Sequence, residues 1–408
     1  MIRRSQHNAG RSHNGSFLLF SLCPGLSALF FSFNLTAGIP RTPANDNEIL
    51  EKISISNSKN TEEIRELKNK LRSNPNNVQL AAKLAKAYIA IAREFTDVRY
   101  YGYAKAVLKP WWHAVSPPVE ALLLRATLHQ QEHQYAKASD DLKQLIKREP
   151  RYAQAWLTLS IIQQVQGNYN AAQASCSALA RTAPTWLATL CYSQVLSFTG
   201  AAKRAYQTQI SIAQQLASSR PDLRQWVLGI SAETALRLGK KSEAEAFFNK
   251  ALAVPLRDAY LLRVYSDYLL SENRADEVLK LLRDEVPDTA LLLRLAIAAK
   301  QLHNKSLSQT YQSLLISRFK AALLRGSKLH ERDEALYLLT FAGDLNKALR
   351  LARNNWRIQK EPDDALVLLR VAMAKQAQAD IKTVQAWLDK TQLQDVRITQ
   401  LLAGVSDE

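Results

Sequence analysis

A fixed interval of 34 residues separates matching positions in the first half of this 408-residue chain. The matching residues are Tyr135, Ala138 and Pro150, followed by Tyr169, Ala172 and Pro184. A repeat of this length, which sets a small residue between an aromatic residue and a proline, is typical of a helical hairpin that occurs twice. Because stacked hairpins share one continuous core, the interval predicts a helical solenoid.

The composition and the turns favour helices along the whole mature chain. The sequence holds only 12 glycines and 13 prolines, and 47 % of its residues are hydrophobic. Small residues such as Ala126 and Ser160 stand where the two helices of a hairpin touch, because a larger side chain would push them apart. We expect Gly167, Gly239 and Gly343 to end the first helix of a hairpin in the left-handed conformation.

Five residues of the best hairpin carry a family resemblance. They are Trp156, Gly167, Tyr169, Ala172 and Pro184. The chain resembles the tetratricopeptide-repeat (TPR) family over roughly residues 76–395, although Arg125 stands where that family favours leucine. The resemblance implies an all-α fold, a right-handed α-solenoid of about eight or nine antiparallel helix pairs. It also implies a protein or peptide partner, bound on the concave face.

The N-terminus is typical of an exported protein. Arg3, Arg4 and Arg11 precede residues 17–35, which carry no charge, and small residues follow at Ala37 and Gly38. We therefore interpret residues 1–38 as a signal peptide or an N-terminal membrane anchor, 39–60 as a flexible linker and 61–408 as the solenoid. Membrane association through residues 17–38 is an alternative to cleavage. Either way, we expect the solenoid in the periplasm, free or anchored to the inner membrane.

Motifs of catalysis and of cofactor or metal binding are absent from the sequence, so we predict a non-enzymatic protein. His113, His129, His133, His303 and His330 are scattered, and each is interpreted as a surface or turn histidine. Two cysteines of the mature chain, Cys176 and Cys191, could pair in an oxidising compartment. The repeat register does not force them together, and we expect them as small buried hydrophobic residues.

The first helix of each pair lines the concave face, and its positions supply the candidate partner-binding residues. These residues are Gln154, Leu157, Ile161, Gln164, Trp226, Glu233, Arg237, Tyr260, Arg263 and Asp267. The face lacks the Lys and Asn set with which some TPR domains grip a C-terminal carboxylate. Arg263 and Asp267 are four residues apart, and we expect an ion pair along one helix rather than a ligand clamp.

A formal charge of +17 makes the chain strongly basic. One helix concentrates part of this charge in a basic stripe, a candidate contact for an anionic surface: Lys347, Arg350, Arg353, Arg357 and Lys360. The stripe lies on the second helix of a pair, whose outer face is ordinarily solvated. An exported location argues against a nucleic acid as the partner.

Together these features predict a protein–protein interaction scaffold in the bacterial cell envelope. The alternative is an adaptor tethered to the inner membrane, whose basic surface contacts anionic lipid or glycan. Nothing in the sequence names the partner.

Overall fold

The computed structural model describes residues 59–216, 220–286, 288–324 and 331–406, and within these ranges the chain is all-helical. The first five helix pairs are α2 (Val78–Phe95) with α3 (Arg99–Val107), α5 (Val119–Gln131) with α6 (Tyr135–Arg148), α7 (Ala153–Val165) with α8 (Tyr169–Leu179), α9 (Thr185–Ser197) with α10 (Ala202–Gln215), and α11 (Pro221–Arg237) with α12 (Lys241–Leu252). Helix α1 (Lys59–Ser73) precedes these pairs, and the short α4 (Lys109–Trp112) follows α3.

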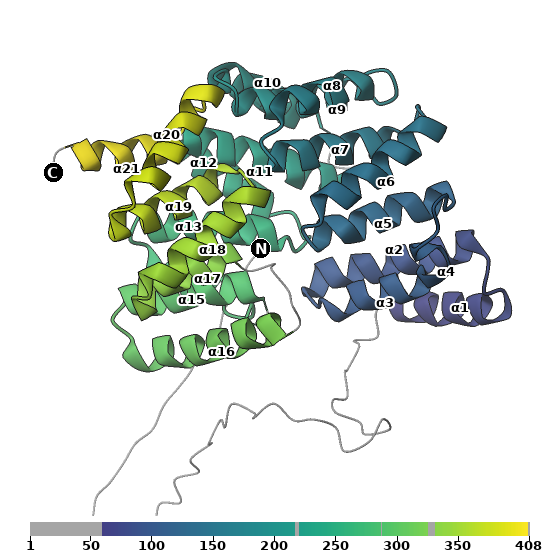
Figure 1. The fold of residues 1–408 in the computed structure, drawn as a ribbon, viewed down its shortest axis with the longest axis horizontal. Helices are drawn as coiled ribbons and strands as arrows, with labels where there is room; N and C mark the ends of the chain where they lie inside the picture. Colours follow the sequence, from purple (N-terminus) through teal and green to yellow (C-terminus); the bar gives the residue numbers. More distant parts are fainter. Residues whose placement is uncertain (1–58, 217–219, 287, 325–330, 407–408) are drawn as a thin grey trace, which may run out of the picture. The chain divides into compact units, whose positions relative to one another are not determined.

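Four more pairs follow. They are α13 (Ala259–Ser271) with α14 (Ala275–Leu281), α15 (Thr289–Gln301) with α16 (Lys305–Leu324), α17 (Glu331–Tyr337) and its π-helical extension η1 (Leu338–Ala342) with α18 (Leu345–Ile358), and α19 (Pro362–Lys375) with α20 (Gln378–Thr391). Helix α21 (Val396–Ser406) ends the described chain (Figure 1). The predicted all-α solenoid of eight or nine pairs is thus confirmed, with nine pairs in the described residues.

A left-handed residue follows the first helix of each of the nine described pairs. Gly167, Gly239 and Gly343 have φ of 73°, 75° and 70°, which confirms the prediction for these three. Pairs without a glycine place another residue there, such as Asn273 with φ of 58°. Asparagine tolerates this conformation better than most residues, so the hairpin geometry survives where the glycine is lost.

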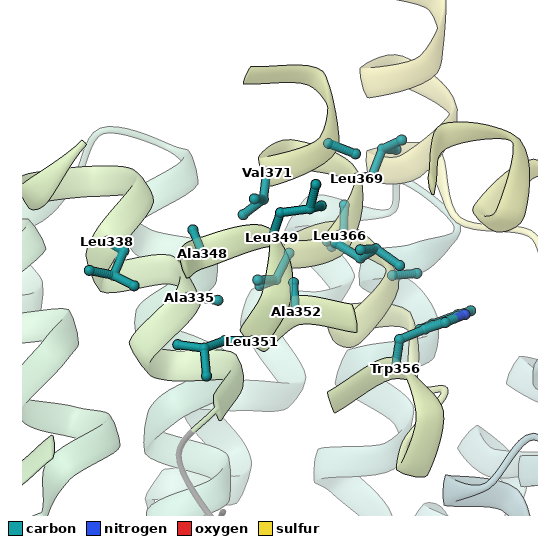
Figure 2. Packing of buried hydrophobic residues seen from close by; sticks show 14 of the residues in the cluster. Ala335, Leu338, Ala348, Leu349, Leu351, Ala352, Trp356, Leu366, Leu369 and Val371 are labelled. Atoms are coloured by element: carbon teal, nitrogen blue, oxygen red, sulfur yellow. The ribbon is translucent and has the colours of Figure 1, made fainter. Parts of the chain in front are cut away.

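The contact between the two helices of a pair is made by small side chains. Ala138, Ala172, Ala205 and Ala244 all have 0 % exposure, as does Ser160, which donates to the carbonyl of Ala172 from the first helix of the same pair at 3.3 Å. Larger residues fill the spaces between pairs. Phe248 is fully buried, and the C-terminal pairs enclose a cluster around Leu338, Leu349 and Leu366 (Figure 2).

Arg125, the departure from the family pattern, has a structural role in the second pair. Its guanidinium donates to the carbonyl of Trp112 at 2.8 Å and forms an ion pair with Asp141 at 2.6 Å. His129 lies beside this pair, 3.8 Å from Asp141, and is only 8 % exposed. The interpretation of His129 as a surface or turn residue is therefore wrong; burial lowers its pKa. His133 does lie in a turn.

The predicted leader and most of the linker, residues 1–58, lie outside the described residues, as does His330. Among the helices that the structure does describe, none combines the length and the apolar composition that crossing a membrane requires. The helix that begins at Lys59 starts at the end of the predicted linker.

Candidate functional site

The C-terminal helices lie against the inner side of the middle pairs. The backbone N–H of Lys360 donates to the carbonyl of Val165 at 2.7 Å, and the Tyr169 hydroxyl donates to the carbonyl of Lys360 at 3.4 Å. These contacts join the end of α7 and the start of α8 to the connection between α18 and α19. The chain therefore covers part of its own predicted concave face.

Three turn glycines provide the room for this contact. An added Cβ at Gly167 would lie 3.2 Å from the side chain of Lys360. The corresponding atom at Gly200 would lie 3.1 Å from Gln392, and that at Gly239 would lie 3.4 Å from Val396. The glycines that the hairpin turns require thus also let the C-terminal segment approach closely.

A cavity of about 60 Å³ remains between the middle pairs and the C-terminal segment. The first helices of the middle pairs contribute Gln164, Glu233, Arg237 and Tyr260 to its lining. The C-terminal segment contributes Lys360, Glu361, Asp363 and Arg397. Helical spacing predicts the first four residues on the same inner face, and the structure brings them together in one cavity.

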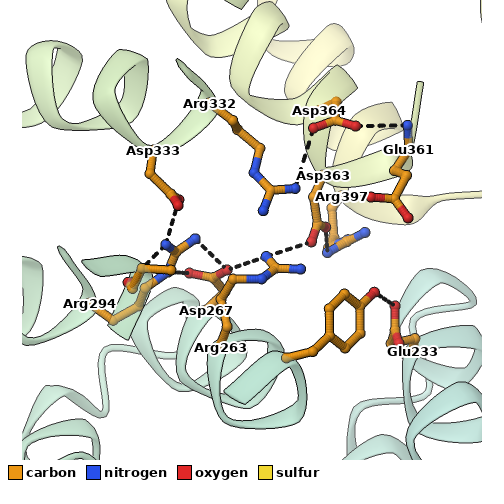
Figure 3. A network of polar contacts seen from close by, with 12 residues as sticks. Glu233, Arg263, Asp267, Arg294, Arg332, Asp333, Glu361, Asp363, Asp364 and Arg397 are labelled. Carbon is orange, nitrogen blue, oxygen red and sulfur yellow. Dashed lines mark hydrogen bonds and ion pairs between the residues drawn. The ribbon is translucent and has the colours of Figure 1, made fainter. Parts of the chain in front are cut away.

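Beside the cavity, a chain of ion pairs ties α13 and α15 to the C-terminal helices (Figure 3). Arg263 contacts Asp267 at 3.3 Å on its own helix and Asp363 at 3.1 Å on α19. Further links are Arg294 with Asp267 and Asp333 at 2.8 and 2.7 Å, Arg332 with Asp364 at 3.3 Å, and Arg397 with Asp363 and Asp395 at 3.2 and 2.6 Å. The i,i+4 pair of Arg263 with Asp267 is confirmed, and it belongs to a larger network.

The carboxyl groups around the cavity have strongly shifted acidities. Burial on its own raises the pKa of Asp363, but Arg263 and Arg397 outweigh it and hold that pKa well below its usual range. The pKa of Glu361 moves the other way: burial and the neighbouring charge of Asp364 raise it to about 8. Glu361 caps α19, and its backbone N–H donates to Asp364 at 3.0 Å. Paired and unpaired carboxyl groups thus lie side by side.

The other predicted groove residues lie in different environments. Ile161 lines the cavity, whereas Leu157 and Trp226 pack against hydrophobic clusters between pairs. Gln154 is exposed, and its side-chain amide donates to Thr158 at 3.2 Å. The inner face is therefore part core, part cavity and part open surface.

The basic stripe is shorter than the spacing suggests. Helix α18 ends at Ile358 and Gln359 is extended, so Lys360 leaves the helical phase. It contributes to the lining of the cavity, and its Nζ lies 6.0 Å from the centre of the Trp356 ring. Lys347 pairs with Glu334 at 2.7 Å, and Arg353 with Asp380 at 2.6 Å. Arg350 and Arg357 are the members of the stripe that stay exposed without an ion pair to any residue that the structure describes.

The two cysteines form a disulfide between α8 and α9. Cys176 and Cys191 have Cα atoms 5.6 Å apart, and both are buried. The expectation of buried side chains is right, but the preference for unpaired thiols is wrong. The bond links the second helix of one pair to the first helix of the next, and Ser160 lies 3.1 Å from Cys176 Sγ.

The sequence did not reveal that the last helices line the site. Asp363 and Asp364 are the acidic residues of the last helices that form ion pairs with Arg263 and Arg332 of earlier helices. Their charge complements Arg263 and Arg332, but charge alone does not tell which helices meet. A charged cluster is ordinarily a solvated surface.

Stacked antiparallel helix pairs, left-handed turns and small contact residues decide the architecture. The chain has a TPR-like fold. No family model matches the chain, and no curated protein sequence matches it.

Among solved structures, this chain is similar to a thermophilic TPR protein of Thermus thermophilus, with 21 % identity and a TM-score of 0.39 over 47 % of this chain and 99 % of that one. It is similar to a TPR protein of Parabacteroides merdae, with 14 % identity and a TM-score of 0.41 over 63 % of this chain and 92 % of that one. It is also similar to a chain of the Cut9–Hcn1 hetero-tetramer of APC/C, with 16 % identity and a TM-score of 0.41 over 78 % of this chain and 60 % of that one. We draw nothing about function from likenesses this distant.

Proposed function

We propose that this protein is a non-enzymatic interaction scaffold of the bacterial cell envelope. The observation that carries the proposal is the run of nine stacked helix pairs in the described residues, since such an array presents one long surface built from many small units. The predicted leader and the Cys176–Cys191 disulfide support an oxidising compartment outside the cytoplasm.

The accessible part of the inner face is where we propose that a partner binds. Of the ten predicted groove residues, Gln154 and Tyr260 are exposed, and the C-terminal helices and the repeat cores enclose much of the remainder. Gln154 lies in the first turn of α7, away from the residues that line the cavity. A partner protein can reach it without displacing the C-terminal helices.

Site-specific photo-crosslinking in the native envelope tests this proposal. A benzophenone amino acid placed at position 154 is expected to capture a defined protein partner. The matched control carries the same group at Lys137, which is exposed on the second helix of the preceding pair. If position 154 captured no protein, or captured only what position 137 captures, the scaffold proposal for this face would fail.

A second candidate function, the membrane-tethered adaptor, draws on Arg350 and Arg357. Both side chains are exposed, and neither has a carboxylate partner within the described residues. N-terminal sequencing of the mature protein decides whether residues 17–38 remain. Carbonate washing releases a cleaved protein and not an anchored one. Binding to anionic vesicles that survives an Arg350→Glu, Arg357→Glu double substitution would exclude this surface.

A further inference from the structure

Four ionisable side chains line the cavity without forming an ion pair with one another. They are the cations of Arg237 and Lys360 and the carboxyl groups of Glu233 and Glu361. Within the described residues, none of the four has a salt-bridge partner. Glu233 accepts a hydrogen bond from the Tyr260 hydroxyl at 2.9 Å, and Glu361 accepts one from the N–H of Asp364. Two basic and two acidic side chains thus border one space without forming an ion pair with one another.

Arg237 lacks the ion pair that its position on the helix predicts. Glu233 and Arg237 are four residues apart on α11, a spacing that ordinarily gives an ion pair. Instead, Arg237 Nη2 donates to the hydroxyls of Ser197 and Thr234, at 2.8 and 3.2 Å, and the guanidinium lies over the ring of Phe198. Its side chain is 4 % exposed, and its Nε has no hydrogen-bond partner. A buried guanidinium without a carboxylate is costly, and a ligand would offset that cost.

The other arginines in and beside the cavity do have carboxylate partners. Arg263 and Arg397 each contact two carboxylates. The acceptor side of the cavity is also incomplete, because Gln164 is 6 % exposed and its Oε1 has no hydrogen-bond partner. The lining therefore offers an unused donor on Arg237 and an unused acceptor on Gln164.

The size of the cavity limits the ligand. A volume of about 60 Å³ is well below the roughly 150 Å³ of a cavity that binds the six-carbon ring of benzene, so only a few atoms fit inside. Tyr260 borders the cavity and is 46 % exposed, which places an entrance at the first turn of α13. Larger peptides or sugars do not fit inside without moving the C-terminal helices.

We propose that this cavity binds a small zwitterion of the α-amino acid class, with its carboxylate at Arg237 and Lys360 and its ammonium group at Glu233 and Glu361. A simple anion would face the two carboxyl groups, and a simple cation would face Arg237 and Lys360. A zwitterion as small as glycine, with part of it in the entrance at Tyr260, satisfies both. The site is independent of the scaffold role and of any protein partner.

The acidities of the lining agree with this assignment. Burial raises the pKa of Glu233, and burial together with Asp364 raises the pKa of Glu361 to about 8. Burial lowers the pKa of Lys360. Each of these groups is buried away from water and has no ion-pair partner in the described residues. The ammonium group of the ligand would be the partner of Glu233 and Glu361, and its carboxylate the partner of Lys360.

Calorimetric titration of the purified protein with glycine and with L-alanine tests the site. We expect saturable binding of at least one of them, at least tenfold tighter than binding of acetate or methylammonium. Arg237→Gln and Glu233→Gln are each expected to weaken it at least tenfold. Lys360→Gln is a milder variant that keeps the fold, and Arg353→Gln, on the outer surface, is the matched control that leaves binding unchanged.

Three results would overturn the proposal. The first is the absence of saturable binding of glycine or L-alanine at millimolar concentration. The second is acetate binding as tightly as glycine, which would mean a site for anions only. The third is unchanged affinity in a folded Lys360→Gln protein, as judged by its circular dichroism.

Discussion

Replacing Asp363 by asparagine isolates the attachment of the C-terminal helices to the middle pairs. The substitution keeps the volume of the side chain and removes its charge. Asp363 contacts Arg263 at 3.1 Å and Arg397 at 3.2 Å, and the side chain of Arg263 is only 6 % exposed. Both arginines then lose one of their two carboxylates.

The structure sets the expected magnitude. Leaving a buried charge without any partner costs about 3–5 kcal/mol. Here Arg263 keeps Asp267 at 3.3 Å, and Arg397 keeps Asp395 at 2.6 Å. The loss is therefore incomplete, and we expect Asp363→Asn to cost about 2–3 kcal/mol of local stability. The control is Asp380→Asn, whose partner Arg353 is 48 % exposed, and it should cost about 1 kcal/mol or less.

Hydrogen exchange followed by mass spectrometry is the appropriate assay, because a solenoid of many pairs need not unfold in one step. About 2–3 kcal/mol corresponds to roughly 30- to 150-fold faster exchange. We expect this acceleration in α19 and α21 and in the facing turn around Gly167, with no change in α5 and α6. Equal effects of the two substitutions, or an effect spread evenly over all pairs, would refute the reasoning.

Three further predictions concern the disulfide, a turn and the pH dependence. Reduction of Cys176–Cys191, which closes a separation of 15 residues, should cost about 3 kcal/mol in urea unfolding. Gly167→Ala should destabilise the protein, because φ is 73° at this position and the side chain of Lys360 would lie 3.2 Å from the new Cβ. Its control, Gly102→Ala, lies in helix α3 with open space around it and should stabilise the protein by up to about 1 kcal/mol. The folded pKa of Glu361 is raised to about 8 from 4.5, so its contribution is complete below pH 4.5 and is lost as the pH rises through 8. Glu361→Gln should flatten stability across that window.

Each of these has an outcome that would contradict it. Free thiols detected in the oxidised, folded protein would remove the disulfide. Equal responses of the two glycine substitutions would show that the turn conformation and the Lys360 contact carry no weight. A slope of stability between about pH 4.5 and 8 that stays unchanged in Glu361→Gln would mean that Glu361 does not titrate in that range.

Much of the fold was predictable because it depends on local rules. Gly167 and Ala172 act within one hairpin, where the turn needs a left-handed residue and the helix contact needs a small one. The same rules place Gln164, Glu233 and Arg237 on the inner face, and all three line the cavity. Helical phase alone is enough for this placement.

Local rules fail where the chain contacts itself at a distance or leaves its helical phase. The spacing of Lys360 fits the outer stripe, but the helix ends two residues earlier. Cys176 and Cys191 sit on different pairs, so their pairing depends on how the pairs stack. His129 is buried beside the ion pair of Arg125 with Asp141, and residue spacing does not show that this pair forms.

The sequence by itself determined the repeating unit, the all-helical class and the residues that face inward, because each follows from spacing within about 34 residues. Only the tertiary structure decided what those inward residues meet. The Tyr169 hydroxyl reaches the carbonyl of Lys360 across 191 residues of chain, and Arg263 reaches Asp363 across 100. Such contacts depend on small rotations accumulated over many pairs, which no single repeat encodes. They turn the inner face from an open groove into a covered cavity with unpaired charges.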